Sequence, residues 1–196
     1  KSRSFLLAWP EKEISDAQET DYEQLLQRRL CGEPVAHLLG SQAFWTLDLE
    51  VTSDTLIPRP ETETLVEQAL EKLPHGVYQV ADLGTGTGAI ALALASERPG
   101  WQVVGCDRVD AAVVLAERNR QRLNIPNASF VQGSWFEPLK GCYDMIVSNP
   151  PYITAAEMLE LEPEVRDFEP RMALTDEGDG LACYRQIIKD AAPFLR

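Results

Sequence analysis

A glycine-rich loop between two acidic residues is the first feature of this sequence that could bind a ligand. Asp82 is followed by Leu-Gly-Thr-Gly-Thr-Gly-Ala, which places glycines at positions 84, 86 and 88. The pattern Gly84-x-Gly86-x-x-Ala89 satisfies the dinucleotide-binding fingerprint, and Asp107 stands at about the offset of a ribose-binding acid. A glycine pattern alone is weak evidence for a binding site, but the acid at this offset strengthens that evidence. We therefore expect a nucleoside-containing cofactor at this loop.

Two details favour S-adenosylmethionine over NAD as that cofactor. Asp82 stands immediately before the glycines, where it could meet a cationic amino-acid group but would repel a pyrophosphate. Ser134-Trp135-Phe136 follows a later apolar run, where the indole of Trp135 could lie against an adenine ring. Burial of Trp135 as an ordinary core residue is the alternative.

The tetrapeptide Asn149-Pro150-Pro151-Tyr152 ends the apolar run that begins at Tyr143. Two prolines remove backbone donors and hold the chain in a stiff loop, so the tetrapeptide could simply terminate a strand. Alternatively, the Asn149 side-chain oxygen and the Pro150 carbonyl could accept the two N–H groups of an amide substrate and aim its lone pair. Tyr152 would pack against the planar amide. The same geometry would suit the exocyclic amine of adenine.

The surrounding pattern predicts a doubly wound, mostly parallel α/β sheet. Short strands are expected at residues 78–84, 101–107, 128–133 and 143–148, with helices at 61–74, 89–99 and 110–123. Strand and helix thus alternate four times. The four polar groups would then fall at the carboxyl ends of consecutive strands and form one site.

Three flanking segments complete the prediction. Residues 15–30 have helical spacing and end at Gly32 and Pro34, as in a small N-terminal helical unit. A hairpin is expected from the alternating run 43–51, the polar turn 52–54 and the segment 55–58. A helix at 181–195 would carry Tyr184, Ile187, Ile188 and Ala191 on one face. Because a crossover helix normally feeds another strand, the chain is expected to be truncated there.

Composition narrows the possible functions. The chain has 196 residues, of which 44% are hydrophobic and 25% charged, as in a globular domain, and its net charge of −13 disfavours bulk binding to nucleic acid. The four cysteines form no Cys-x-x-Cys pair, and His37 and His75 have no ligand cluster around them, so no metal site is expected. No long apolar segment suggests a membrane span, and we expect a cytoplasmic protein.

With these motifs, the chain resembles the class I S-adenosylmethionine-dependent methyltransferases. More closely, it is similar to the HemK/PrmC family of protein-(glutamine-N5) methyltransferases, which act on peptide chain release factors. The likeness covers nearly the whole chain and includes "GEPVAHLLG", "LIPRPETE", "FEPRMAL" and "GDGLACYRQII". Asn-Pro-Pro-Tyr alone is shared with adenine-N6 DNA methyltransferases and some RNA enzymes, whereas "IPRPETE" together with "EPRMAL" is more specific.

This resemblance implies a Rossmann-like methyltransferase domain at residues 61–196, a remnant of an N-terminal helical substrate-binding domain at 1–40, and a hairpin linker at 41–60. The family normally has a fuller helical bundle and further C-terminal strands. The implied reaction moves a methyl group from S-adenosylmethionine to N5 of the glutamine in the Gly-Gly-Gln motif of release factors, leaving S-adenosylhomocysteine. A monomer is expected.

The resemblance also assigns residues to roles. The implied cofactor-binding residues are Asp82, Gly84, Thr85, Gly86, Thr87, Gly88, Asp107, Trp135 and Asn149. The implied catalytic residues are Asn149, Pro150 and Tyr152. The implied substrate-binding residues are Asn149, Pro150, Pro151, Tyr152, Arg59 and Glu61, the last two having a structural capping role as the alternative.

Three other functions remain to be weighed. An adenine-N6 or other nucleic-acid methyltransferase would need a basic surface for a flipped base, which the net charge of −13 opposes. An NAD-binding oxidoreductase fits the glycines but leaves Asn149-Pro-Pro-Tyr152 without a task. A catalytically idle module that holds a partner through its N-terminal helices is the third.

Overall fold

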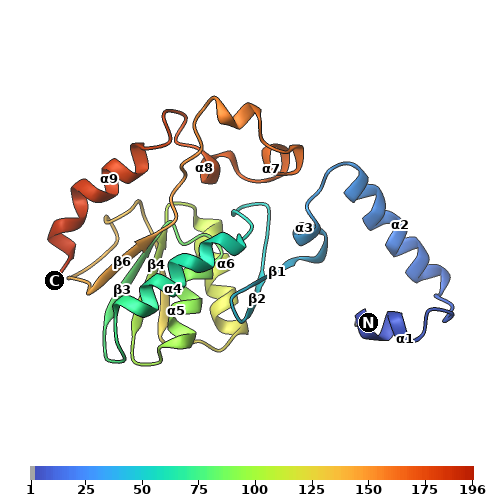
Figure 1. Ribbon diagram of the computed structural model, residues 1–196, viewed down its shortest axis with the longest axis horizontal. Helices are drawn as coiled ribbons and strands as arrows, with labels where there is room; N and C mark the ends of the chain where they lie inside the picture. Colours follow the sequence, from blue (N-terminus) through green and yellow to red (C-terminus); the bar gives the residue numbers. More distant parts are fainter. Residues whose placement is uncertain (1–2) are drawn as a thin grey trace.

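A computed structural model describes residues 3–196 and shows an α/β domain with a helical arm (Figure 1). Its main sheet contains β3 (Gln79–Leu83), β4 (Gln102–Asp107), β5 (Ala128–Gln132) and β6 (Met145–Ser148) in the order β5-β4-β3-β6, with every pair parallel. The predicted Rossmann-like sheet is therefore confirmed. The chain winds outward from β3 to β5 and then returns to add β6 on the other side of β3.

Alternate residues of each strand face two different apolar clusters, as the two-residue period of a strand requires. On one face, Val80, Val103, Phe130 and Val147 pack with residues of α4 (Glu63–Lys72) and α5 (Ala89–Glu97). On the other face, Ala81, Leu83, Cys106 and Ile146 pack with α9 (Ala182–Ala191) and the short η3 helix (Ala192–Phe194). Helices thus cover both faces, which is the doubly wound arrangement.

The first two connections between sheet strands contain the predicted helices, but the third connection contains none. Helix α5 connects β3 to β4, and α6 (Asp110–Arg122) connects β4 to β5. Between β5 and β6, however, residues 133–144 form a loop without a helix, so the expected alternation fails at this step. Gly133, Pro138 and Gly141 interrupt this segment, and Phe136 and Leu139 bury its apolar side chains in the second cluster instead.

The hairpin forms at a different turn from the one predicted. It pairs β1 (Ser41–Phe44) with β2 (Leu47–Glu50), so the turn lies at Trp45 and Thr46 rather than at residues 52–54. Trp45 adopts a left-handed backbone conformation, with φ of 56°, and its backbone N–H donates to Glu63. The expectation was wrong because an alternating run conceals a turn that tertiary contacts stabilise.

The last helix also differs in detail. Ile187 and Ala191 of α9 pack against the sheet, but the side chains of Ile188 and Tyr184 are 75% and 37% exposed. The predicted apolar face was therefore too wide. After η3, Leu195 forms a parallel bridge with Tyr143, and the Tyr143 backbone N–H donates to the carbonyl of Phe194.

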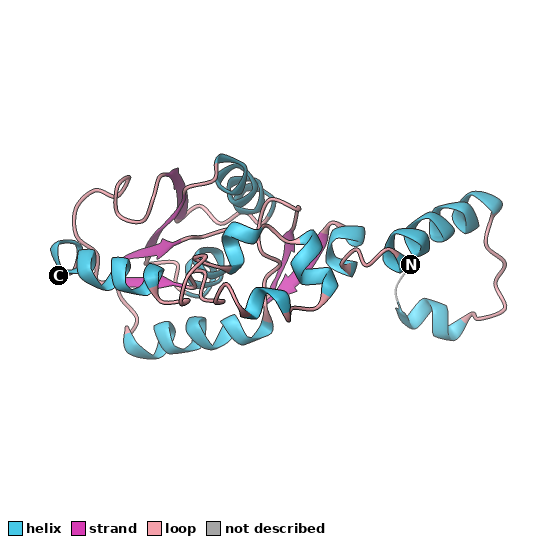
Figure 2. Cartoon of the chain, turned by 90° about the horizontal axis from the view of Figure 1, so that it is seen from above, coloured by secondary structure: helices cyan, strands magenta, loops and turns pink. Residues whose placement is uncertain are grey.

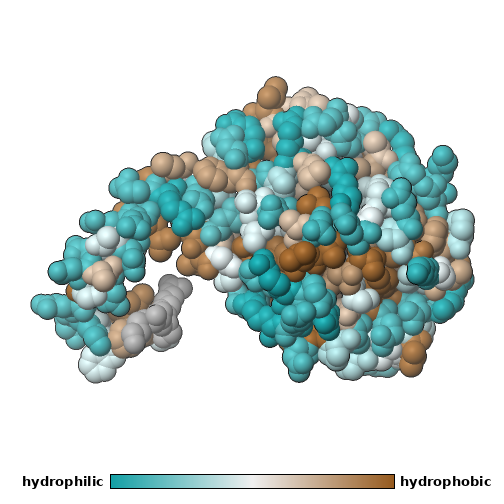
Figure 3. Space-filling model, turned by 180° about the vertical axis from the view of Figure 1, so that it is seen from behind, coloured by the Kyte–Doolittle hydropathy of each residue, from teal (hydrophilic) through white to brown (hydrophobic). Residues whose placement is uncertain are grey.

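An arm of helices projects from the body (Figures 1 and 2). It comprises α1 (Arg3–Ala8), α2 (Asp16–Leu30) and the short α3 (Val35–Leu39), which leads into the hairpin. Ser15 caps α2 in a capping box with Gln18. The arm carries exposed apolar side chains among hydrophilic ones (Figure 3), including Leu6, Trp9 and Tyr22.

Further short helices lie outside the sheet. They are η1 (Pro60–Thr62), η2 (Glu157–Leu159), α7 (Pro163–Phe168) and α8 (Arg171–Leu174). Arg29 of α2 forms an ion pair of 2.5 Å with Glu164 of α7. Within residues 3–196, none of the helices is both long and apolar enough to cross a lipid bilayer.

Candidate active site

A cavity of about 760 Å³ opens at the carboxyl ends of the four parallel strands. All four polar groups singled out in the sequence contribute to its wall. The lining residues from these loops are Gly84, Thr85, Gly86, Thr87, Asp107, Ser134, Trp135, Asn149 and Pro151. Its size is within the range of small-molecule sites, and its position is where open α/β sheets bind ligands.

The glycine loop is held by backbone and carboxylate contacts to the next strand. The backbone N–H groups of Gly84 and Thr85 both donate to the Cys106 carbonyl at 2.9 Å. The Gly86 N–H donates to one oxygen of Asp107 at 3.0 Å, and the other oxygen accepts from the Val109 N–H at 3.0 Å. Asp107 therefore fixes the loop and the start of α6 together, and each of its oxygens keeps a second lone pair for a ligand.

Asp82 lies behind the glycine loop rather than in the cavity wall. Its side chain is fully buried, and one oxygen accepts a hydrogen bond of 2.6 Å from the Thr85 hydroxyl. The other oxygen has no partner among the described residues. Burial raises the pKa of Asp82 to about 7, and the nearby charge of Asp107 acts in the same direction. The structure thus places Asp82 next to Thr85, and a direct contact with a cofactor stays a prediction.

Gly88 also lies away from the cavity. A Cβ at this position would lie within 3.2 Å of Phe130, Leu92 and Ala116 side chains, so its absence lets α5 pack closely on its neighbours. Its left-handed backbone, with φ of 82°, begins α5 directly after the loop.

Trp135 lines the cavity beside the glycine loop. A Cβ on Gly84 would lie 3.7 Å from the Trp135 ring, so the two loops approach closely. The Trp135 carbonyl accepts a hydrogen bond from the buried Cys106 thiol at 3.0 Å. Trp135 both lines the cavity and packs against the second apolar cluster, so the two readings of this residue are compatible.

Two side-chain hydrogen bonds and one close backbone approach constrain the Asn-Pro-Pro-Tyr loop. The Ser148 hydroxyl donates to the Leu83 carbonyl at 2.7 Å and ties the end of β6 to β3. The side-chain NH₂ of Asn149 donates to the Thr62 hydroxyl at 3.2 Å. Gly180, with φ of 74°, lies so close to Tyr152 that a Cβ there would overlap the Tyr152 carbonyl oxygen. Pro150 is buried and the Tyr152 side chain is 56% exposed, and neither residue lines the cavity.

The two residues predicted from the "IPRPETE" segment lie in different environments. Arg59 lines the cavity and forms an ion pair with Glu169, whose carboxylate also accepts the Ile57 N–H at 2.9 Å. The Glu169 side chain is almost fully buried. Glu61 is exposed in η1 and does not line the cavity. The "IPRPETE" and "FEPRMAL" segments are thus joined through a largely buried ion pair.

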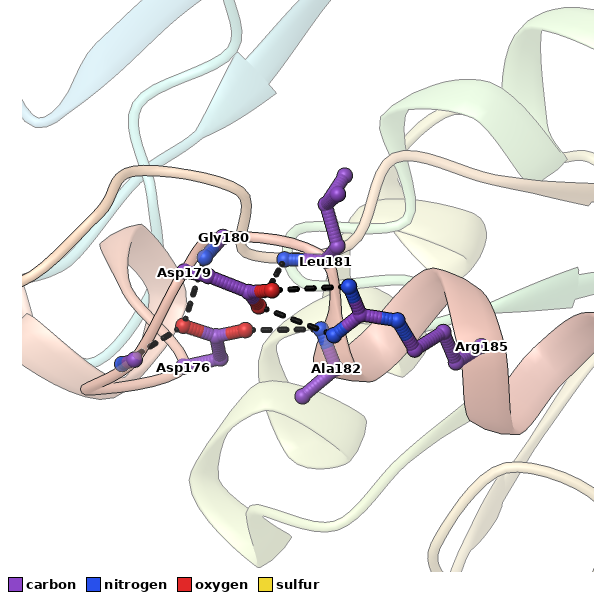
Figure 4. A network of polar contacts seen from close by, with 7 residues as sticks. Asp176, Asp179, Gly180, Leu181, Ala182 and Arg185 are labelled. Atoms are coloured by element: carbon purple, nitrogen blue, oxygen red, sulfur yellow. Dashed lines mark hydrogen bonds and ion pairs between the residues drawn. The ribbon is translucent and has the colours of Figure 1, made fainter.

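Sequence reasoning missed a loop that borders the cavity at residues 175–181. The Asp176 carboxylate accepts the backbone N–H groups of Gly178, Gly180 and Ala182 at 2.8–3.0 Å (Figure 4). These hydrogen bonds, that of Ala182 first, hold the pKa of Asp176 below its usual value. The motif "GDGL" drew attention to this segment, but nothing in the sequence indicated that Asp176 organises it.

Thr62 was also missed, although it lies within "IPRPETE". Its hydroxyl contacts Asn149 over a separation of 87 positions. A contact over that separation has no local sequence signal.

Comparison with known proteins first defines the class. Residues 61–162 match the methyltransferase small domain family, and residues 1–40 match the PrmC N-terminal domain family. A crystal structure of a methyltransferase from Pyrococcus furiosus shares the fold, with a TM-score of 0.55 and 20% identity, covering 87% of this chain and 73% of that one. The chain therefore belongs to the class of methyltransferases.

Two curated relatives define the family. A release factor glutamine methyltransferase from Pseudomonas aeruginosa is 54% identical over 196 residues, which cover 100% of this chain and 71% of the relative. One from Salmonella typhimurium is 50% identical, covering 100% of this chain and 70% of the relative. The chain belongs to the release factor glutamine methyltransferase family.

Proposed function

We propose that this chain transfers a methyl group from S-adenosylmethionine to the side-chain amide nitrogen of the glutamine in the Gly-Gly-Gln motif of peptide chain release factors. The observation that carries the proposal is that Asn149 and the glycine loop line one cavity. Family membership supports the same reaction. Since release factors act in translation, the reaction would take place in the cytoplasm.

The residues present fit S-adenosylmethionine. Asp107 has free lone pairs for the two ribose hydroxyls, and Trp135 offers an aromatic face for the adenine. The absence of a side chain at Gly84 and Gly86 lets the backbone approach the methionine part. The unpartnered oxygen of Asp82 lies behind this loop, where a bound cation would favour the ionised carboxylate and a pyrophosphate would oppose it.

A carboxamide nitrogen is a poor nucleophile because its lone pair is delocalised into the carbonyl. The Asn149 side-chain oxygen and the Pro150 carbonyl would each accept one N–H of the substrate and hold the nitrogen in one orientation. Buried Pro150 and the proline at 151 make these acceptors stiff before substrate arrives. The exposed side chain of Tyr152 would pack against the planar amide of the substrate glutamine.

Bound S-adenosylmethionine supplies an electrophilic methyl group on a sulfonium, whose sulfur keeps the bonding electron pair and becomes a neutral thioether. The substrate nitrogen forms the new C–N bond and releases one proton to water, so charge and atoms balance. Asn149 and Pro150 hold the N–H protons through this step without accepting either. The site therefore needs no ionisable general base beside the nitrogen.

The test is methylation of a release factor that carries a Gly-Gly-Gln loop. The protein would be incubated with the factor and methyl-labelled S-adenosylmethionine, and the modified residue located by mass spectrometry. We expect one label on the glutamine side chain. Label in DNA or RNA and none in the release factor would instead support the adenine alternative. Calorimetric titration with S-adenosylhomocysteine and with NAD would decide the cofactor class independently.

A further inference from the structure

Thr62 has a hydroxyl that the helix beside it does not use. It occupies the N-cap position of α4, where threonine usually accepts a backbone N–H of the first turn. Here its side chain makes no capping hydrogen bond. Its Oγ1 atom instead accepts the side-chain N–H of Asn149 at 3.2 Å, and the residue lines the cavity.

In the structure this contact places Nδ2 of Asn149 against the Thr62 hydroxyl and leaves Oδ1 on the opposite side of the amide. A carboxamide is planar, with a donor NH₂ and an acceptor oxygen on opposite sides, so anchoring Nδ2 also fixes Oδ1. Among the described residues, Oδ1 of Asn149 accepts no hydrogen bond. The oxygen is therefore free to accept a substrate N–H. In the flipped orientation, the Thr62 hydroxyl would donate to Oδ1, but the Asn149 NH₂ group would meet the substrate NH₂, and two donors repel. A substrate that offers an N–H therefore favours the orientation in which Thr62 accepts.

We propose that Thr62 is a positioning residue for methyl transfer, holding the Asn149 amide in the orientation that presents its oxygen to the substrate. The inference rests on the proposed function, because an acceptor is needed only if the substrate offers an N–H. The prolines and Gly180 constrain the path of the backbone, whereas Thr62 anchors one side chain.

Thr62→Val is the direct test, since valine keeps the shape and removes the acceptor. We expect kcat toward the release factor to fall by about tenfold, the scale of one net hydrogen bond, with unchanged affinity for S-adenosylhomocysteine and nearly unchanged melting temperature. Thr62→Ser should restore kcat to within about threefold, since serine keeps the hydroxyl. Thr64→Val is the matched control, because Thr64 is an exposed threonine in the same helix.

A double variant separates positioning from a general structural effect. In an Asn149→Ala background, Thr62→Val should cause no further loss, because the group that it positions is absent. A second tenfold loss there would overturn the inference, as would a normal kcat for Thr62→Val alone. A wild-type protein that binds cofactor but leaves the release factor unlabelled would refute the proposed function itself.

Nuclear magnetic resonance gives a readout that does not depend on activity. In protein labelled with ¹⁵N-asparagine, the Asn149 side-chain signals can be assigned by their loss in Asn149→Ala. Thr62→Val should shift these signals and speed their exchange with water, whereas Thr62→Ser and Thr64→Val should leave them nearly in place. Signals unmoved in Thr62→Val would show that the contact does not exist in solution.

Discussion

The glycine loop and the Asn-Pro-Pro-Tyr loop follow neighbouring strands but are held in opposite ways. Leu83 at the end of β3 is paired in register with Ser148 at the end of β6, and a side-chain hydrogen bond joins the two residues. From there, one loop bends through three glycines with positive φ. The other is stiffened by two prolines and bears no glycine.

Their supports differ in distance along the chain. Asp82 bonds to Thr85, only three positions away, and Asp107 of the adjacent strand holds Gly86. The Asn-Pro-Pro-Tyr loop depends on Thr62 and on Gly180, which belong to the segments before and after the sheet. The difference fits the proposed tasks: a loop that wraps a cofactor needs close backbone approach, whereas acceptors that aim a substrate need fixed directions.

The largest expected effect comes from removing the aimed acceptor. Asn149→Ala should lower methyl transfer by roughly two to three orders of magnitude, the scale of one preorganised contact to a transition state, while leaving most cofactor affinity intact. Single-turnover rates and calorimetry with S-adenosylhomocysteine would measure the two quantities. A variant with near-normal turnover would show that the tetrapeptide only ends a strand.

The Gly180 contact offers the next test of the comparison. In Gly180→Ala, a new methyl group overlaps the Tyr152 carbonyl, so the Asn-Pro-Pro-Tyr loop must move. Because a displacement of about 1 Å can cost about a hundredfold in rate, we expect a loss approaching that size with less change in cofactor affinity. The measurement is kcat together with the melting temperature.

Gly141→Ala is the matched control for backbone strain. Gly141 also has a positive φ, of 81°, but a Cβ there would meet nothing within 4 Å. Both variants therefore suffer the left-handed penalty of about 1–2 kcal/mol in stability, and only Gly180→Ala should lose catalysis. Equal activity in the two would mean that the loop does not depend on Gly180.

Sequence patterns predicted the glycine loop and the strand ends well because their determinants are local. Hydrophobic runs located all four sheet strands within a few residues, and parallel pairing brings their carboxyl ends together whatever the details. Asp107 and Trp135 were found by their distance from predicted strand ends, and both line the cavity.

The features that were missed depend on contacts between distant segments. Nothing near Asn149 indicates Thr62, and nothing near Glu169 indicates Arg59, because each pair is brought together only by the fold. The hairpin turn at Trp45 was misplaced for a similar reason: Glu63, 18 positions later, binds its backbone. Local pattern carries no information about such partners.

For the glycine loop, the matching test is Asp107→Ala, which should weaken binding of the cofactor. Removing its carboxylate frees the Gly86 and Val109 N–H groups and takes away the acceptors expected for the ribose. We expect S-adenosylhomocysteine to bind more weakly by roughly 1–3 kcal/mol. Asp107→Asn, which retains one acceptor, should fall between. Unchanged affinity in the folded alanine variant would refute the assignment.

The smallest effect concerns pH, and it belongs to the glycine loop alone, because only that loop rests on a buried carboxylate with a raised pKa. Burial raises the pKa of Asp82 from 3.8 to about 7. Between these values, the folded protein holds a proton that the unfolded chain has lost, so the stability contributed by this group falls as pH rises, by up to about 1 kcal/mol per pH unit. Asp82→Asn keeps an acceptor for Thr85 and has no titrating group, so it should gain stability relative to wild type as pH rises toward about 7. Urea midpoints measured from about pH 5.5, above the isoelectric point of about 4.6, would show this change, and parallel pH profiles for the two proteins would contradict it.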